Sequence, residues 1–163
     1  MKITEALLAE HVVFHHLFDY AENTVPKLKT LAEIHALSCV IETMLQNHTH
    51  VEDHLLIAPL EAAFSQMGQA DNFHEEHQHI EEQLGLIIRT RRLSDAKQRL
   101  LAAVTLCRKH FDKEERIVFP LAEKQLSQKS LLLLGKRWEE QRTKPVGSGS
   151  ARDFSFIATT VRA

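Results

Sequence analysis

Apolar side chains recur every three or four positions along most of the chain, which is the spacing of one face of an α-helix. Four long segments carry this pattern: residues 4–23, residues 30–64, a third from Asp71 to the arginine-rich turn before Ser94, and a fourth from Ser94 to about Leu126. A shorter apolar segment from Ser127 to about Arg142 predicts a fifth helix. The pattern therefore predicts an all-α protein, in which four long helices bury one shared core.

Residues typical of helix ends occur at the boundaries of these segments and at two positions inside them. Thr4 and Asp71 are expected N-caps, because their side-chain oxygens can accept bonds from free backbone N–H groups. Pro26 closes the first segment. Pro59 and Pro120 fall inside the second and fourth, and each is expected to kink its helix or end its regular part.

Composition and charge narrow the class of protein. A chain of 163 residues suits one domain, here residues 1–142. The net charge is -2 and the basic residues are scattered along the chain, so nucleic acid and acidic membranes are not expected as partners. The acidic N-terminus and the absence of a long apolar run predict a cytoplasmic protein. After Pro145 the composition changes to Gly and Ser and then to a short apolar stretch, so residues 143–163 form a separate tail that could join two subunits as a homodimer.

The 11 histidines are the unusual feature of the composition. In the second segment His48 and Glu52 share the apolar stripe, and in the fourth segment His110 and Glu114 do the same. Buried carboxylates are costly unless they are paired or bound to metal, and no Lys or Arg occupies these stripes. The two His-x-x-x-Glu pairs therefore predict that a cation is bound in the core.

The first and third segments add His11 and His77 on their inner faces. His15 and His74 lie one turn from these residues and are either further ligands or core histidines bonded to carbonyls; Glu81 competes with Ile80 for an inward place, and we expect it to contact ligands at most. The predicted metal set is His11, His48, Glu52, His77, His110 and Glu114, brought to one level by four antiparallel helices. The apolar neighbours expected to exclude water are Phe14, Phe18, Leu55, Phe111 and Ile117.

Four blocks resemble the hemerythrin-like, or HHE, cation-binding family: residues 10–14, the pair His48 and Glu52, residues 76–80, and residues 110–120. The resemblance extends over residues 1 to about 142 and implies an up-and-down four-helix bundle with two irons. It implies that Glu52 and Glu114 bridge the metals, with His11 and His48 on one iron and His77 and His110 on the other; manganese or zinc would suit the same ligands. The oxygen carriers of the family have another histidine where this chain has Phe73, next to His74.

Three functions are compatible with such a site. The first is a binder or sensor of O2 or NO. The second is an enzyme or iron-handling protein that oxidises iron, reduces peroxide or donates iron for repair of iron-sulfur clusters. The third is a bundle without metal, in which the inward polar groups bond to one another; the complete set of six argues against it.

Overall fold

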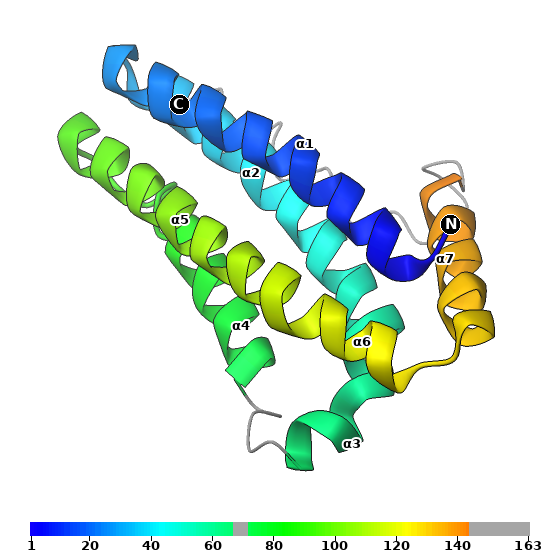
Figure 1. Cartoon of the computed structure of the whole chain (residues 1–163). Coiled ribbons are helices and arrows are strands. Elements are labelled where there is room, and N and C mark those ends of the chain that lie inside the picture. Colours follow the sequence, from blue (N-terminus) through cyan, green and yellow to red (C-terminus); the bar gives the residue numbers. More distant parts are fainter. Residues whose placement is uncertain (67–71, 144–163) are drawn as a thin grey trace.

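The computed structural model describes residues 1–66 and 72–143, and every regular element within these ranges is a helix. Figure 1 shows four long rods that run alternately up and down: α1, then α2 continued by η2 and α3, then α4, then α5 continued by η3 and α6. The bounds are α1 Ile3–Thr24, α2 Leu31–Glu52, η2 Asp53–Ile57, α3 Ala58–Gln66, α4 Asn72–Gly85, α5 Leu93–Lys113, η3 Glu114–Val118, α6 Phe119–Gln125 and α7 Gln128–Thr143, and a 3-10 turn, η1, lies at Val25–Lys27. The predicted up-and-down four-helix bundle with a short fifth helix is confirmed.

The core consists of two clusters along the bundle, an upper core and a lower core, the lower one lying at the start of α1. One cluster packs around Phe18, Ile41 and Leu100, and the other around Leu7 and Leu56, where α7 adds the buried side chains of Leu131 and Leu134. Burial of these apolar stripes, rather than helix propensity, supplies most of the stability of such helices. α7 lies against α1 at the end of the bundle where the chain starts (Figure 1).

The helix starts differ in part from those expected. Thr4 is not an N-cap: α1 already begins at Ile3, and the buried Thr4 hydroxyl donates a hydrogen bond to Glu123 over 2.5 Å. Before α2, Thr30 accepts a bond from the backbone N–H of Glu33, whose carboxylate accepts the N–H of Thr30 in return. The other expected cap, Asp71, and the tail beyond Thr143 lie outside the described residues.

Pro59 and Pro120 were expected to kink the helix or end its regular part, and the α-helix is interrupted before each of them by a widened turn. It resumes at the residue that precedes each proline. Each follows a five-residue π segment, η2 or η3, and the first residue after each segment donates its backbone N–H to the carbonyl five residues earlier, from Ala58 to Asp53 and from Phe119 to Glu114. The wide turns change which side chains face the core. Ile117, expected on the inner stripe, is 37% exposed, and the next residue, Val118, is fully buried in its place.

Helical spacing also predicts that Leu8 in the first segment and Ile88 in the third face the core, and both predictions are wrong. Leu8 is 44% exposed and Ile88 is 60% exposed. Ile88 lies after the end of α4, in the turn that leads to α5, where helical periodicity no longer fixes the direction of a side chain.

Candidate metal centre

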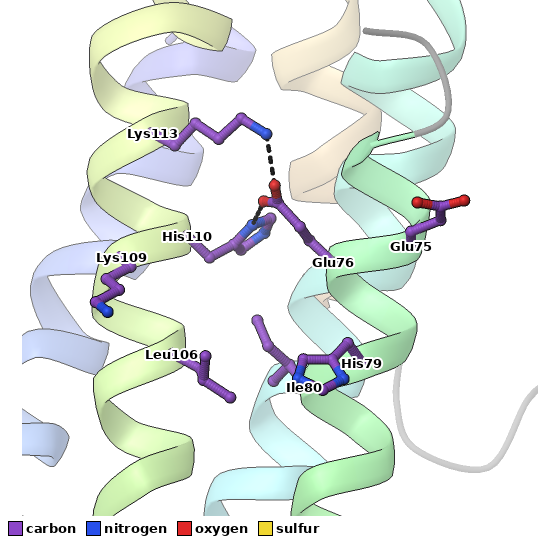
Figure 2. A pocket seen from close by; sticks show the side chains of 8 residues that line it. All are labelled: Glu75, Glu76, His79, Ile80, Leu106, Lys109, His110 and Lys113. Atoms are coloured by element: carbon purple, nitrogen blue, oxygen red, sulfur yellow. Dashed lines mark hydrogen bonds and ion pairs between the residues drawn. The ribbon is translucent and has the colours of Figure 1, made fainter.

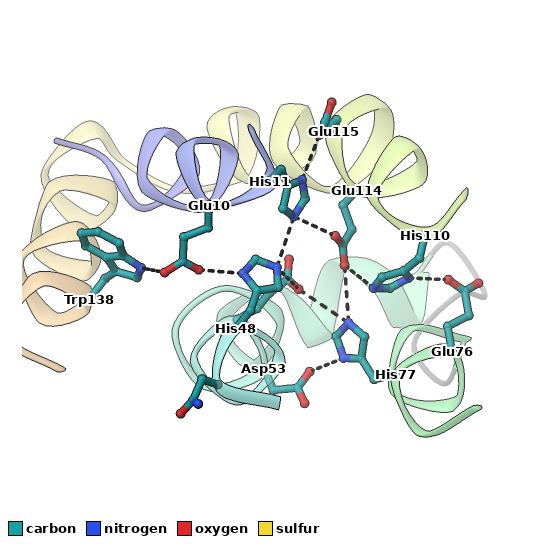
Figure 3. A network of polar contacts seen from close by, with 12 residues as sticks. Glu10, His11, His48, Asp53, Glu76, His77, His110, Glu114, Glu115 and Trp138 are labelled. Atoms are coloured by element: carbon teal, nitrogen blue, oxygen red, sulfur yellow. Dashed lines mark hydrogen bonds and ion pairs between the residues drawn. The ribbon is translucent and has the colours of Figure 1, made fainter. Parts of the chain in front are cut away.

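Six of the eight polar side chains that are buried within the described residues are the six predicted from the sequence. Each long rod contributes one histidine, as Figure 3 shows, and the second and fourth rods add a fully buried carboxylate each. The set is His11 on α1, His48 and Glu52 on α2, His77 on α4, His110 on α5 and Glu114 at the start of η3. The helical register predicted around His48 is also found, since His50 and His54 are exposed.

Two buried groups of potential ligand atoms form at this level, and a third, partly exposed group joins His77 to Asp53 and His74. Glu52, His77, His110 and Glu114 form one group, His11, His48 and Glu114 form the other, and the atoms within each group lie within 4.8 Å of one another. The structure thus divides the histidines into the same two pairs that the family resemblance implies.

Glu114 belongs to both groups and lies between them. Its Oε2 is 3.3 Å from Nε2 of His11, while its Oε1 is 2.6 Å from Nε2 of His110 and 3.4 Å from Nε2 of His77. Glu52 lies less closely between two histidines, with Oε2 at 3.6 Å from Nε2 of His77 and 3.8 Å from Nε2 of His48. One carboxylate with an oxygen toward each group has the arrangement required to bridge two cations.

A ring of four further carboxylates holds the outer nitrogens of the four histidines. Each Nδ1 lies at hydrogen-bond distance from an acid on a neighbouring rod: His48 from Glu10, His77 from Asp53, His110 from Glu76 and His11 from Glu115, at 2.7, 3.1, 2.9 and 2.9 Å. Going around the bundle, each rod therefore provides a histidine to one neighbour and an acid to the next (Figure 3). With the Nδ1 proton shared with an acid, each Nε2 lone pair is directed inward, which is the orientation a metal requires.

These four acids were missed in the sequence. They are partly exposed and lie off the apolar stripes, so the stripe criterion could not select them. A usable signal was present, because every acid of the ring is the immediate sequence neighbour of a buried member of the site: Glu10 precedes His11, Asp53 follows Glu52, Glu76 precedes His77 and Glu115 follows Glu114.

Burial and mutual charge strongly perturb the protonation of the inner set. Burial, followed by the charge of Glu114, raises the pKa of Glu52 well above its ordinary value. Burial also opposes the charged form of His77 and His110, but it is outweighed in both. His77 donates hydrogen bonds to Asp53 and Glu114, while His110 is stabilised by the charge of Glu114 and by hydrogen bonds that it donates to Glu114 and Glu76, so each pKa is raised to about 9. Without a metal, protons would therefore take the place of cations among these residues.

The donor set fits a pair of metal ions. Both oxygens of Glu52 and Oε2 of Glu114 are buried without a hydrogen-bond partner in the described structure. Unpaired buried carboxylate oxygens are expensive, and a cation satisfies them together with the imidazole nitrogens around them. Mixed imidazole and carboxylate ligands suit iron, manganese and zinc.

The three additional candidates lie outside this inner group. His15 is 37% exposed and lies 3.5 Å from Glu115, while His74 is 50% exposed and lies 3.3 Å from Asp53. Both therefore contact acids of the ring. Glu81 is half-buried on α4, where its charge acts on Glu42 rather than on the inner histidines.

Aromatic rings cover the centre. Phe111 stacks on His11 with ring centroids 3.8 Å apart and nearly parallel planes, and Phe14 meets His48 edge-on at 5.3 Å. Phe119 adds a third ring, 5.3 Å from His11. These contacts exclude bulk water, whereas Ile117, which was expected to share this role, points outward.

Two cavities border the site, and each is lined by one histidine of a different pair. One of about 530 Å³ lies between α4 and α5 and is lined by His110, Glu76, Lys113 and Leu106, among others (Figure 2). The other, of about 420 Å³, borders His48 and is lined by residues of α1, α2 and α7. Each cavity also borders the acid that holds Nδ1 of its histidine, Glu76 in the first and Glu10 in the second.

Comparison with known proteins agrees with this geometry. Residues 2–122 match the family model of the hemerythrin HHE cation-binding domain, a range that includes all six inner residues and the four acids of the ring. No curated protein and no solved structure matches the chain. Across the described residues, the helices lack the combination of length and hydropathy needed to cross a membrane. The chain belongs to the hemerythrin HHE cation-binding domain family.

Proposed function

We propose that this protein holds two iron ions between its four rods and uses them to bind or sense a small molecule such as O2 or NO. His11 and His48 would hold one ion, His77 and His110 the other, and Glu52 and Glu114 would bridge them. The observation that supports this most directly is Glu114, whose two oxygens face the two histidine pairs separately.

The iron pair would supply redox electrons and an open coordination position for the small molecule. The protein supplies the surroundings. The acid ring fixes the orientation of the imidazoles, and the rings of Phe14, Phe111 and Phe119 keep the pocket dry, which favours a small, weakly polar molecule over water. A cavity borders one histidine of each pair, which supports an approach of the small molecule from either side.

The alternative is an enzyme or iron-handling protein that oxidises iron, reduces peroxide, or donates iron for repair of iron-sulfur clusters. The same ligands serve both functions, so the difference lies in what happens to the bound species. Reversible binding supports a sensor or carrier, whereas steady turnover or net release of iron supports the alternative.

Elemental analysis combined with optical spectra of aerobically and anaerobically purified protein tests the proposal. We expect two irons per chain and a charge-transfer band that appears with O2 or NO and disappears when the gas is removed. The exposed-histidine variant His50→Ala is the matched control and should behave like the wild type. A wild-type chain with fewer than two metals, or with manganese or zinc only, would refute the iron proposal. The cytoplasmic location and a homodimer formed through residues 143–163 stay predictions.

A further inference from the structure

The fifth helix, α7, lies outside the range matched by the family, which ends at residue 122, yet it is fitted closely onto the bundle. Gly135 shows how close the approach is, since a Cβ atom at this position would lie 2.1 Å from the carbonyl oxygen of Met1 and 3.0 Å from the carbonyl carbon of Lys2. Leu131 and Leu134 bury their side chains in the lower core. The position of α7 is therefore specific and does not result from loose packing.

From this position α7 directs three N–H donors at one carboxylate, that of Glu10. Trp138 Nε1 donates to Oε1 over 3.0 Å, and Arg142 donates from Nε to Oε1 over 2.7 Å and from Nη2 to Oε2 over 3.0 Å. The Arg142 guanidinium also donates to the backbone carbonyl of Asn47 over 3.3 Å. Asn47 precedes His48, and Glu10 holds Nδ1 of His48, so α7 fixes this ligand through both its backbone and its ring.

Each of the other three acids of the ring has a single side-chain contact from outside the four inner histidines. Glu76 receives Lys113 of α5, at 2.5 Å, while Asp53 and Glu115 lie near the partly exposed His74 and His15 at 3.3 and 3.5 Å. Within the described residues, Glu10 is thus the one acid of the ring whose charge is neutralised by a bidentate arginine contact. A bidentate guanidinium contact is both stronger and more exact in orientation than a single ammonium or imidazole contact.

We propose that Arg142 and Trp138 are positioning residues that make the two metal positions inequivalent. By fixing Glu10 they orient His48, and by neutralising Glu10 they reduce the negative charge that reaches His48 through its Nδ1 proton. His48 then donates less electron density to its metal than a histidine whose acid partner carries a full charge. The metal part of this proposal rests on the proposed function, whereas the orientation of His48 can be tested without a metal.

The first experiment uses the metal-free full-length chain and follows the Nδ1 proton of His48 by nuclear magnetic resonance. We expect its exchange with solvent to be about tenfold faster in Arg142→Gln, because a well-aligned charged hydrogen bond to Glu10 no longer has its support. Arg137→Gln is the matched control, since Arg137 is exposed on the same helix. Equal exchange rates in the wild type and Arg142→Gln would overturn the positioning role even if the iron proposal is correct.

The second experiment compares iron-loaded variants of equal metal content by reduction potential and optical spectrum. Arg142→Gln should shift the potential to more negative values, because an uncompensated Glu10 stabilises the more highly charged metal. Arg142→Lys, which keeps the charge but not the two-pronged contact, should lie between it and the wild type. Gly135→Ala should produce a shift in the same direction by displacing α7, although alanine is the better helix former.

The outcomes of the second experiment separate the two proposals. Unchanged potentials and spectra in both Arg142→Gln and Gly135→Ala, at full iron content, would overturn the inequivalence and leave α7 a structural element only. A wild-type chain that binds no iron would refute the proposed function together with the inequivalence, while the exchange measurement would still decide the orientation of His48.

Discussion

Raising the pH from 6.5 to 9 should destabilise the metal-free protein. His77 and His110 have a pKa of about 9 in the folded chain, compared with an ordinary value of 6.5. Both therefore bind protons more tightly when folded, so their stabilising effect is fully present below pH 6.5 and is lost as the pH rises through about 9. The raised pKa of Glu52 acts in the same direction, since its folded form also retains a proton.

The size of this effect follows from the shifts. Each histidine shift corresponds to about 3 kcal/mol of linked stability. Because both rings face Glu114, the two contributions overlap, and we expect a loss of about 3 kcal/mol for the pair, which lowers the melting temperature by about 10 °C in a chain of this size.

Thermal unfolding of chelator-treated protein, followed by circular dichroism at several pH values, measures this loss. His110→Gln should flatten the dependence, whereas His79→Gln, a change at an exposed position on α4, should leave it intact. Metal-loaded protein should show little of it, because the metal replaces the protons. A melting temperature that stays constant or rises between pH 6.5 and 9 in the metal-free wild type would refute the reasoning.

Three other outcomes are expected. Glu114→Ala should reduce the metal content from two ions to one or none, because two close cations need a shared anion, while His50→Ala and His54→Ala should leave it unchanged; elemental analysis decides both. Removing the metals should lower the melting temperature but barely change the far-ultraviolet circular dichroism, since the apolar stripes persist; an unaltered melting temperature would contradict a metal site of this form. Phe111→Ala should cost about 3–5 kcal/mol in the free energy of unfolding by denaturant, because the ring is buried and stacks on His11, and a loss below about 1 kcal/mol would contradict that packing role.

The sequence predicted the rods and the inner residues for the same reason: both follow from which positions share a helix face. His48 and Glu52 are four residues apart on an apolar stripe, and this places them in the core whatever the neighbouring helices are. The ring of acids depends on the neighbours. Glu10 lies off the stripe of α1, and only the position of α2 beside it shows that its partner is His48 rather than solvent. The role of α7 depends in turn on the close approach that Gly135 allows.

The two π segments connect the inner site with the lower core. An uninterrupted α-helix that directed Glu114 inward and Glu115 toward His11 would bring Ile117 back to the inner face, but the wider turn of η3 delays the return by one residue, to Val118. In both rods the segment begins at or directly after the buried glutamate and ends two residues before a proline. Proline has no N–H to contribute to an α-helical bond, so a regular turn would gain less there than elsewhere. The spacing from histidine to proline is one residue longer in the second rod, and η2 starts one residue later relative to its histidine than η3 does. The one-residue difference therefore lies upstream of the π segments, while both glutamates stay four residues after their histidines and are fully buried.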